Sequence, residues 1–173
     1  MQLKPQDTLL ALKFWSLQRQ GETDSVRGMA QSIGVSAGEI SKSTKRLAAS
    51  HLVAERSGRV YAESGALLEW LCFGVRYAYP QENIGYGRGL ATAWNCPLLK
   101  SEMTPPSPAT VWGAPGGNSD GRLIRPIHES VPYAANHDDN LYRAFSLLEA
   151  IRGGKPRELA IAREQLAQLI KGI

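Results

Sequence analysis

Apolar positions recur every three or four residues over three long stretches of the chain. Residues 3–20 show this spacing, and Pro5 suits the first turn of a helix there. Residues 65–79 repeat the pattern with more apolar surface than one exposed face needs, so we expect burial in a core or a dimer seam. Residues 138–173 show it twice around a short Gly-Pro loop, which predicts a helical hairpin.

Between the first two stretches, shorter signals predict two helices joined by a tight turn. Ser25 suits the N-cap of a short helix with apolar residues at helical spacing. Gly34 suits the left-handed residue that ends a helix. Ser36 suits the next N-cap, and Glu39 follows three residues later, so the pair predicts a capping box.

The second of these helices has two unlike faces. Ile40 and Leu47 share one side and predict a core contact. The opposite side carries small and cationic residues, namely Gly38, Ser41, Lys42, Lys45, Arg46 and Ala49. Small residues allow a helix to approach a DNA major groove closely, and the cations can reach phosphates or guanine edges.

Two short apolar runs follow, residues 52–54 and 59–61, on either side of a Ser57-Gly58 turn signal. They predict a small hairpin with Arg56 and Arg59 beside its tip. Arginines at such a tip suit a contact with the DNA backbone or minor groove. Together with the two helices, this is the composition of a winged helix-turn-helix.

The pattern resembles the DNA-binding half of winged helix-turn-helix bacterial transcription regulators, of the MarR-like and ArsR-like kind. The residues that carry the resemblance are Ala30, Ile33, Gly34, Val35, Ser36, Ile40, Ser41, Lys42, Leu47, Leu52, Val53, Gly58 and Tyr61. It covers residues 1–79, and we match the C-terminal half to no characterised family. The resemblance implies double-stranded DNA as a partner, and a homodimer, because such regulators commonly pair through helices outside the motif.

After residue 79 the composition changes. Seven of the ten prolines lie in residues 80–126 among many glycines, which predicts a long irregular connection with short strands or helical turns. Within it, we interpret residues 85–89 as a turn, and residues 111–127 as a small hairpin around a glycine turn. The predicted fold is therefore mainly α with a small β-wing, in three parts. These are a winged helix-turn-helix DNA-binding domain (1–79), a Pro/Gly-rich connection (80–137), and a helical hairpin for dimerisation or partner binding (138–173).

Charge and chemistry narrow the function further. The net charge is +4, and residues 1–79 hold ten Lys and Arg against seven Asp and Glu, so most of the excess lies on the predicted DNA-binding part. Cys72 and Cys96 show no metal-ligand spacing, so we expect no zinc site and reduced thiols in a cytoplasm. No spacing of nucleophile, base and orienter is present, so we expect neither an enzyme nor a cofactor. No apolar stretch is long enough for a membrane span.

The leading prediction is a sequence-specific DNA-binding transcriptional regulator, most simply a dimeric repressor. Its predicted DNA-contacting residues are Ser36, Gly38, Ser41, Lys42, Lys45, Arg46, Arg56, Ser57 and Arg59. One alternative is a protein-interaction subunit that captures a partner protein, as an antitoxin does. Another is a small-molecule sensor whose pocket is built by Trp94, Trp112 and Tyr133.

Overall fold

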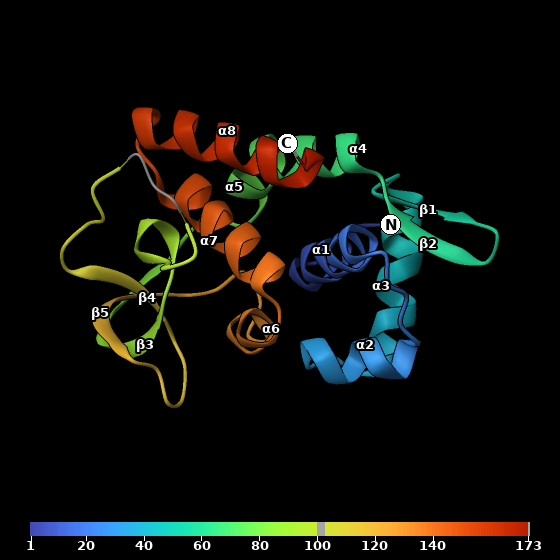
Figure 1. Cartoon of the computed structure of the whole chain (residues 1–173), viewed down its shortest axis with the longest axis horizontal. Helices are drawn as coiled ribbons and strands as arrows, with labels where there is room; N and C mark the ends of the chain where they lie inside the picture. The colour runs from blue at the N-terminus through green and yellow to red at the C-terminus, as the bar shows by residue number, and fades with distance from the viewer. Residues whose placement is uncertain (100–102, 173) are drawn as a thin grey trace.

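The computed structural model describes residues 1–99 and 103–172. The chain begins with three helices and a two-stranded antiparallel hairpin, grouped at the right of Figure 1. Their bounds are α1 (Pro5–Gln20), α2 (Val26–Ile33), α3 (Ala37–Ala49), β1 (Val53–Arg56) and β2 (Arg59–Ala62). This arrangement is compatible with a winged helix-turn-helix, and each predicted element of residues 1–62 is present.

The predicted caps form, with one difference. The Ser25 hydroxyl accepts the Gly28 N–H at 2.9 Å, and Gly34 ends α2 with a φ of 70°. The Ser36 hydroxyl accepts the Glu39 N–H at 3.3 Å, which is one half of the expected capping box. The Glu39 carboxylate instead accepts from Gln6 Nε2 at 2.7 Å, because α1 lies close enough to offer a donor.

The predicted long helix over residues 65–79 forms without a gap, but a π-helical turn divides its α-helical hydrogen bonding. It consists of α4 (Ser64–Glu69), a π-helical turn η1 (Trp70–Gly74) and α5 (Val75–Ala78). Leu67, Leu71 and Val75 are fully buried, whereas Phe73 and Tyr77 are 60% and 72% exposed. The helix therefore buries one side in its own chain and leaves two aromatic side chains in solvent.

The middle of the chain is not an irregular connection, which corrects the predicted fold class to mixed α and β. It contains β3 (Asn83–Ala91), a 3₁₀ turn η2 (Ala93–Asn95), β4 (Ala109–Gly113) and β5 (Ser119–Ile124). The strand β3 pairs antiparallel with both β4 and β5, which pair parallel with each other, so the three strands close on themselves. The predicted hairpin over residues 111–127 is therefore wrong.

The prediction of a turn at residues 85–89 is also wrong, because those residues lie within β3. Two glycines of this sheet instead allow neighbouring strands to come close together. A Cβ at Gly89 would stand 1.8 Å from the carbonyl oxygen of Trp112 on β4. A Cβ at Gly121 would stand 2.1 Å from the carbonyl oxygen of Ala109. Only glycine permits backbones to approach this closely.

Three helices complete the chain: α6 (Val131–His137), α7 (Asp139–Gly153) and α8 (Pro156–Lys171). The helices α7 and α8 pack against each other, as the predicted helical hairpin requires. The Asp138 carboxylate caps α7 by accepting the N–H groups of Asn140 and Leu141 at 2.9 and 3.2 Å. The short helix α6 was not predicted.

The helix α1 lies between α2, α3 and β2 on one side and α7 on the other, and it contacts all four (Figure 1). Buried apolar side chains from α1 through α8 form one continuous cluster. Trp15 is 2% exposed, and its Nε1–H donates to the carbonyl oxygen of Ile170 at 3.2 Å. Lys13 forms a buried ion pair with Asp138 at 3.4 Å. No helix within the described ranges is long and apolar enough to cross a membrane.

Candidate nucleic-acid interface

The helix α3 and the hairpin of β1 and β2, called the wing below, form the outer edge of the molecule (Figure 1). Ser41, Lys42 and Lys45 are exposed on α3, as are Ser36 and Gly38 at its start. The wing tip has positive φ values at both central residues, 51° at Ser57 and 74° at Gly58. This geometry is typical of the tight turns that join hairpin strands.

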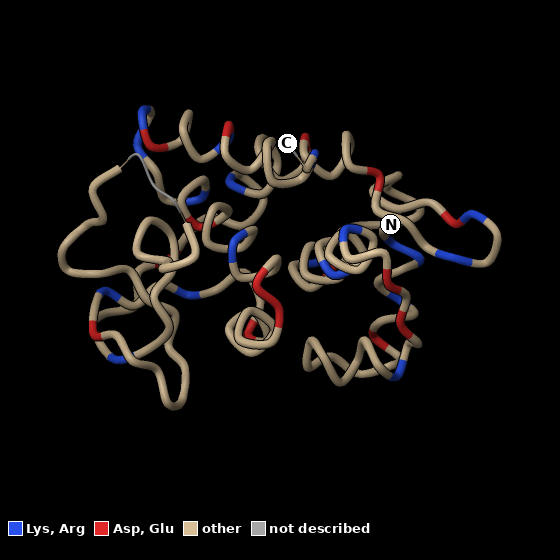
Figure 2. The backbone as a smooth tube through the Cα atoms, in the orientation of Figure 1, with Lys and Arg blue, Asp and Glu red and all other residues tan. Residues whose placement is uncertain are grey.

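The wing carries cations on both of its strands, visible as blue segments on each arm in Figure 2. Arg56 and Arg59 are opposite each other in the strand register, next to the tip, and both are exposed. The Arg56 guanidinium contacts the Glu63 carboxylate and lies 5.8 Å from the centre of the Tyr61 ring. Arg56 is therefore partly neutralised, although it remains accessible.

Arg46 is not part of the exposed face, which corrects its predicted DNA contact. Its side chain is 8% exposed, and its Nε and Nη2 donate to the two oxygens of Asp7, each at 2.8 Å. The Nη2 also donates to the Ser43 hydroxyl at 3.0 Å. The hydrogen bonds to Asp7 raise the pKa of the guanidinium. The helical position of residue 46 borders the apolar stripe, and Asp7 on α1 draws the guanidinium inward.

The remaining cations of this surface differ in how they are paired. Lys42 lies 3.4 Å from the Glu39 carboxylate in an exposed pair that solvent screens. Lys45 and Arg59 make no ion pair with any residue that the structure describes. The positive charge available to an anionic partner is therefore concentrated at Lys45 on α3 and Arg59 on the wing.

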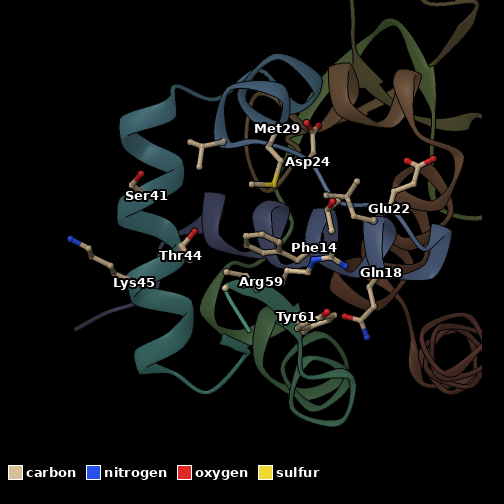
Figure 3. A pocket seen from close by; sticks show the side chains of 15 residues that line it. Phe14, Gln18, Glu22, Asp24, Met29, Ser41, Thr44, Lys45, Arg59 and Tyr61 are labelled. Atoms are coloured by element: carbon tan, nitrogen blue, oxygen red, sulfur yellow. The ribbon is translucent and has the colours of Figure 1, made fainter. Parts of the chain in front are cut away.

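A cavity of about 550 Å³ lies between α3, the wing, α1 and the start of α2 (Figure 3). We call it the wing cavity. Its floor is apolar and includes Phe14 and Met29, which are 7% and 4% exposed and point inward in Figure 3. Its remaining lining residues are Leu17, Gln18, Glu22, Thr23, Asp24, Val26, Ser41, Thr44, Lys45, Gly58, Arg59, Val60 and Tyr61.

Three residues that the sequence predicts as DNA contacts line the outer part of this cavity, but the sequence does not predict its floor. Ser41, Lys45 and Arg59 were predicted from the pattern of one helix and one turn. In the sequence, Phe14 and Met29 have the spacing of ordinary core residues. That spacing is the same whether a neighbouring element packs against them or lies far enough away to leave a cavity. The cavity depends on the distance between elements that are separate in the sequence, and no local pattern reports that distance.

Of the three aromatic residues proposed for a sensor pocket, Trp94 alone lines either of the two cavities given for the described residues. Trp94 lines a second cavity of about 260 Å³, which includes neither Trp112 nor Tyr133. Trp112 is fully buried and its Nε1–H donates to Glu149 at 3.3 Å. Tyr133 lies on α6, and its hydroxyl donates to the carbonyl oxygen of Gln31 at 3.1 Å.

Glu149 belongs to a buried and fully partnered cluster that ties α7 to β4. Its two oxygens accept from Arg152 Nη1 at 2.8 and 2.9 Å, and one of them accepts from Gln81 Nε2 at 3.0 Å. Burial raises the pKa of Glu149, and these contacts together with the Trp112 bond oppose that shift. The cluster holds the sheet against α7.

Comparison of the chain with family models, curated proteins and solved structures finds no match. What the coordinates define is a protein of mixed α and β structure that begins with three helices and a hairpin. A fold alone does not specify a function, which depends on the chemistry of a site such as the surface of α3 and the wing.

Proposed function

We propose that this chain is a sequence-specific DNA-binding transcriptional regulator that acts in the cytoplasm as a dimeric repressor. One observation carries the proposal. The exposed face of α3 and the wing lie on the same edge of the molecule. Each carries one exposed cation that makes no ion pair with any described residue, Lys45 on α3 and Arg59 on the wing. A helix that enters a major groove beside a wing that holds the flanking backbone needs this arrangement.

The proposed contacts divide into two kinds. Ser41, Lys42 and Lys45 on α3 address base edges and adjacent phosphates in the major groove. Ser36 and Gly38, at the start of α3, present exposed backbone to a phosphate beside the positive end of the helix. On the wing, Ser57, Arg56 and Arg59 contact the flanking DNA backbone or minor groove. When DNA binds, the Arg56 guanidinium leaves the Glu63 carboxylate and pairs with a phosphate instead. Arg46 positions α3 and does not contact DNA.

We place the dimer seam at the aromatic face of the helix that follows the wing. Phe73 and Tyr77 lie one helical turn apart and are the exposed aromatics of that helix, 60% and 72% accessible. Arg163 of α8 covers one face of the Phe73 ring at 4.5 Å, so the patch continues onto a second helix. A two-fold axis through this face presents two copies of α3 to two half-sites.

Light scattering on the intact protein tests the seam. We expect a dimer for the natural chain and a monomer for the double variant Phe73→Ser and Tyr77→Ser, with unchanged helical content. The same face also suits a partner protein, which is the second candidate function. A 1:1 complex with a different protein in purification from the native host, together with a monomer after its removal, would favour that candidate.

Selection of genomic fragments by the purified protein at two salt concentrations tests DNA binding itself. Lys45→Ala should weaken binding to the selected fragment by about 1–3 kcal/mol if Lys45 contacts a base edge. If it contacts a phosphate, affinity should fall evenly across sequences and the salt slope should drop by about one. Arg157→Ala is the matched control, because Arg157 is also exposed but lies on α8. Unchanged affinity after Lys45→Ala and Arg59→Ala together would refute the proposal.

A further inference from the structure

We infer that α6 positions the proposed DNA-contacting helix α3, through two hydroxyl groups that hold the turn between α2 and α3. The positioning residues are Ser130, the N-cap residue of α6, and Tyr133, which lies on α6. The first part, that α6 holds the turn, stands on contacts within the chain. The second part, that these contacts raise DNA affinity, rests on the proposed function.

The two hydroxyl groups donate to backbone carbonyl groups where α2 ends. The Tyr133 hydroxyl donates to the carbonyl oxygen of Gln31 at 3.1 Å. The Ser130 hydroxyl donates to the carbonyl oxygen of Gly34 at 3.0 Å. Gln31 is among the last four residues of α2, whose carbonyl groups find no partner within the helix. The two side chains therefore satisfy acceptors at the place where the chain turns from α2 toward α3.

The turn and α6 are also in direct contact. A Cβ at Gly34 would lie 3.3 Å from Cδ1 of the Tyr133 ring and 3.5 Å from the Ser130 hydroxyl oxygen. Gly34 has a φ of 70°, and its N–H and that of Val35 both donate to the carbonyl oxygen of Ala30, at 3.0 and 3.2 Å. Two backbone hydrogen bonds therefore close the turn, and two side-chain hydrogen bonds tie it to α6.

The helix α2 needs such support because it is short. It has eight residues, whereas an isolated helix needs roughly 12–15 to be even marginally stable in water. Its buried residues are Met29 and Ile33, so its position depends on contacts with the rest of the fold. Arg46 holds the C-terminal half of α3 against α1. The turn fixes the direction in which the chain enters α3, and the contacts with α6 fix the turn.

The helix α6 is itself held firmly in the fold. Val131 and Ala134 are fully buried in the core. Asp138, the C-cap residue of α6, forms an ion pair with Lys13 and accepts the hydroxyl of Ser16 at 2.7 Å, both on α1. The helix is therefore a fixed support, and hydroxyl groups on it can restrain a neighbouring turn.

A turn that is fixed before DNA arrives lowers the cost of binding. Without the two hydroxyl groups the turn would sample more conformations, and apparent DNA affinity would fall with the fraction that is competent to bind. The net contribution of one protein hydrogen bond corresponds to a factor of about two to ten in an equilibrium constant. Each hydroxyl should therefore change DNA affinity by about that factor without contacting DNA.

Amide hydrogen exchange on the full chain without DNA tests whether α6 holds the turn. The reporters are the N–H groups of Gly34 and Val35, whose hydrogen bonds close the turn. In Tyr133→Phe and in Ser130→Ala, we expect their exchange to become about two to ten times faster. Exchange at the natural rate in the double variant would overturn the inference.

Two controls separate a local effect from a general loss of stability. Tyr86→Phe removes the hydroxyl of another exposed tyrosine, on β3, and should change no exchange rate. The N–H of Leu148, a buried residue of α7, reports opening of the whole fold and should exchange at its natural rate in every variant. If exchange rises equally at the turn and at Leu148, the hydroxyl groups only stabilise the fold, which would also overturn the inference.

The effect on DNA affinity is measured with the genomic fragment that the natural chain selects. We expect each single variant to bind about two to ten times more weakly, the double variant more weakly than either, and Tyr86→Phe normally. Natural affinity in the double variant would overturn the inference. Weaker binding without faster exchange at the turn would do the same, because the hydroxyl groups would then contact DNA directly. If the natural chain binds no DNA, the proposed function is refuted, and exchange still decides whether α6 holds the turn.

Discussion

The buried ion pair between Asp7 and Arg46 offers the sharpest test of how α3 is held. Asp7 is 1% exposed and Arg46 is 8% exposed, and two hydrogen bonds of 2.8 Å join them. Asp7→Ala removes the carboxylate and leaves a buried guanidinium without its partner. It also removes the acceptor of the Lys4 N–H at the start of α1, a bond of 2.7 Å.

The magnitude follows from the balance of attraction and desolvation. At this separation the attraction between unit charges is about 6 kcal/mol for an effective dielectric constant near 20, and much of it offsets the cost of removing both groups from water. Breaking such a pair from one side costs about 3–5 kcal/mol, and the lost helix cap adds about 1 kcal/mol. The whole fold is stable by about 5–15 kcal/mol, so Asp7→Ala removes a large share.

Urea unfolding followed by circular dichroism measures the effect. We expect Asp7→Ala to lower the unfolding midpoint with an unchanged m-value, and the double variant Asp7→Leu with Arg46→Met to recover most of the loss. Lys42→Ala, at a solvent-exposed pair, is the control and should have little effect. A loss below about 1 kcal/mol for Asp7→Ala, the range of exposed pairs, would refute the reasoning. The double variant should also retain DNA affinity, whereas a base contact by Arg46 would abolish it.

Three further substitutions probe the elements around this surface. Gly34→Ala forces a side chain into a left-handed conformation at φ 70° and should cost about 1–2 kcal/mol in thermal unfolding, with Gly38→Ala, at an ordinary φ, as control. Asp138→Ala removes the cap of α7 and the partner of Lys13, so it should destabilise more than Asp138→Asn, which keeps the cap. Burial lowers the pKa of His128 from 6.5, and its Nδ1 accepts the Ser130 N–H at 3.2 Å. The neutral ring therefore stabilises the fold above pH 6.5, and this contribution is lost as the pH falls below it. His128→Gln should flatten the decline in unfolding free energy between about pH 7 and pH 5.

The elements of the first 62 residues could be predicted because their signals are local. Ser25 and Ser36 cap helices through N–H groups three residues away, and Gly34 ends a helix through its own φ. The Ser57-Gly58 turn needs only its two central residues in left-handed conformations. Each of these contacts closes within one turn of backbone, so the chemistry and the spacing appear together in the sequence.

The sheet of β3, β4 and β5 could not be predicted in this way. Its glycines suggest turns in the sequence. In the fold, Gly89 is required by the close approach of the antiparallel strand β4, and Gly121 by the close approach of β4 as a parallel neighbour of β5. The strands β4 and β5 run parallel because each of them pairs antiparallel with β3. The short segment that connects them does not indicate this. Composition alone indicated an irregular connection where the fold has close contacts between strand backbones.

By itself, then, the amino-acid sequence determined the helices of residues 1–62, their caps, the C-terminal helical hairpin, the wing and the cationic character of α3, because these depend on periodicity and neighbouring residues. Tertiary structure alone decided which cations face solvent: Asp7 on α1 withdraws Arg46, Glu63 occupies Arg56, and Lys45 and Arg59 keep no such partner among the described residues. It also decided that a cavity opens between α3 and the wing. Both outcomes depend on distances between separate elements, and these are set only when the core forms.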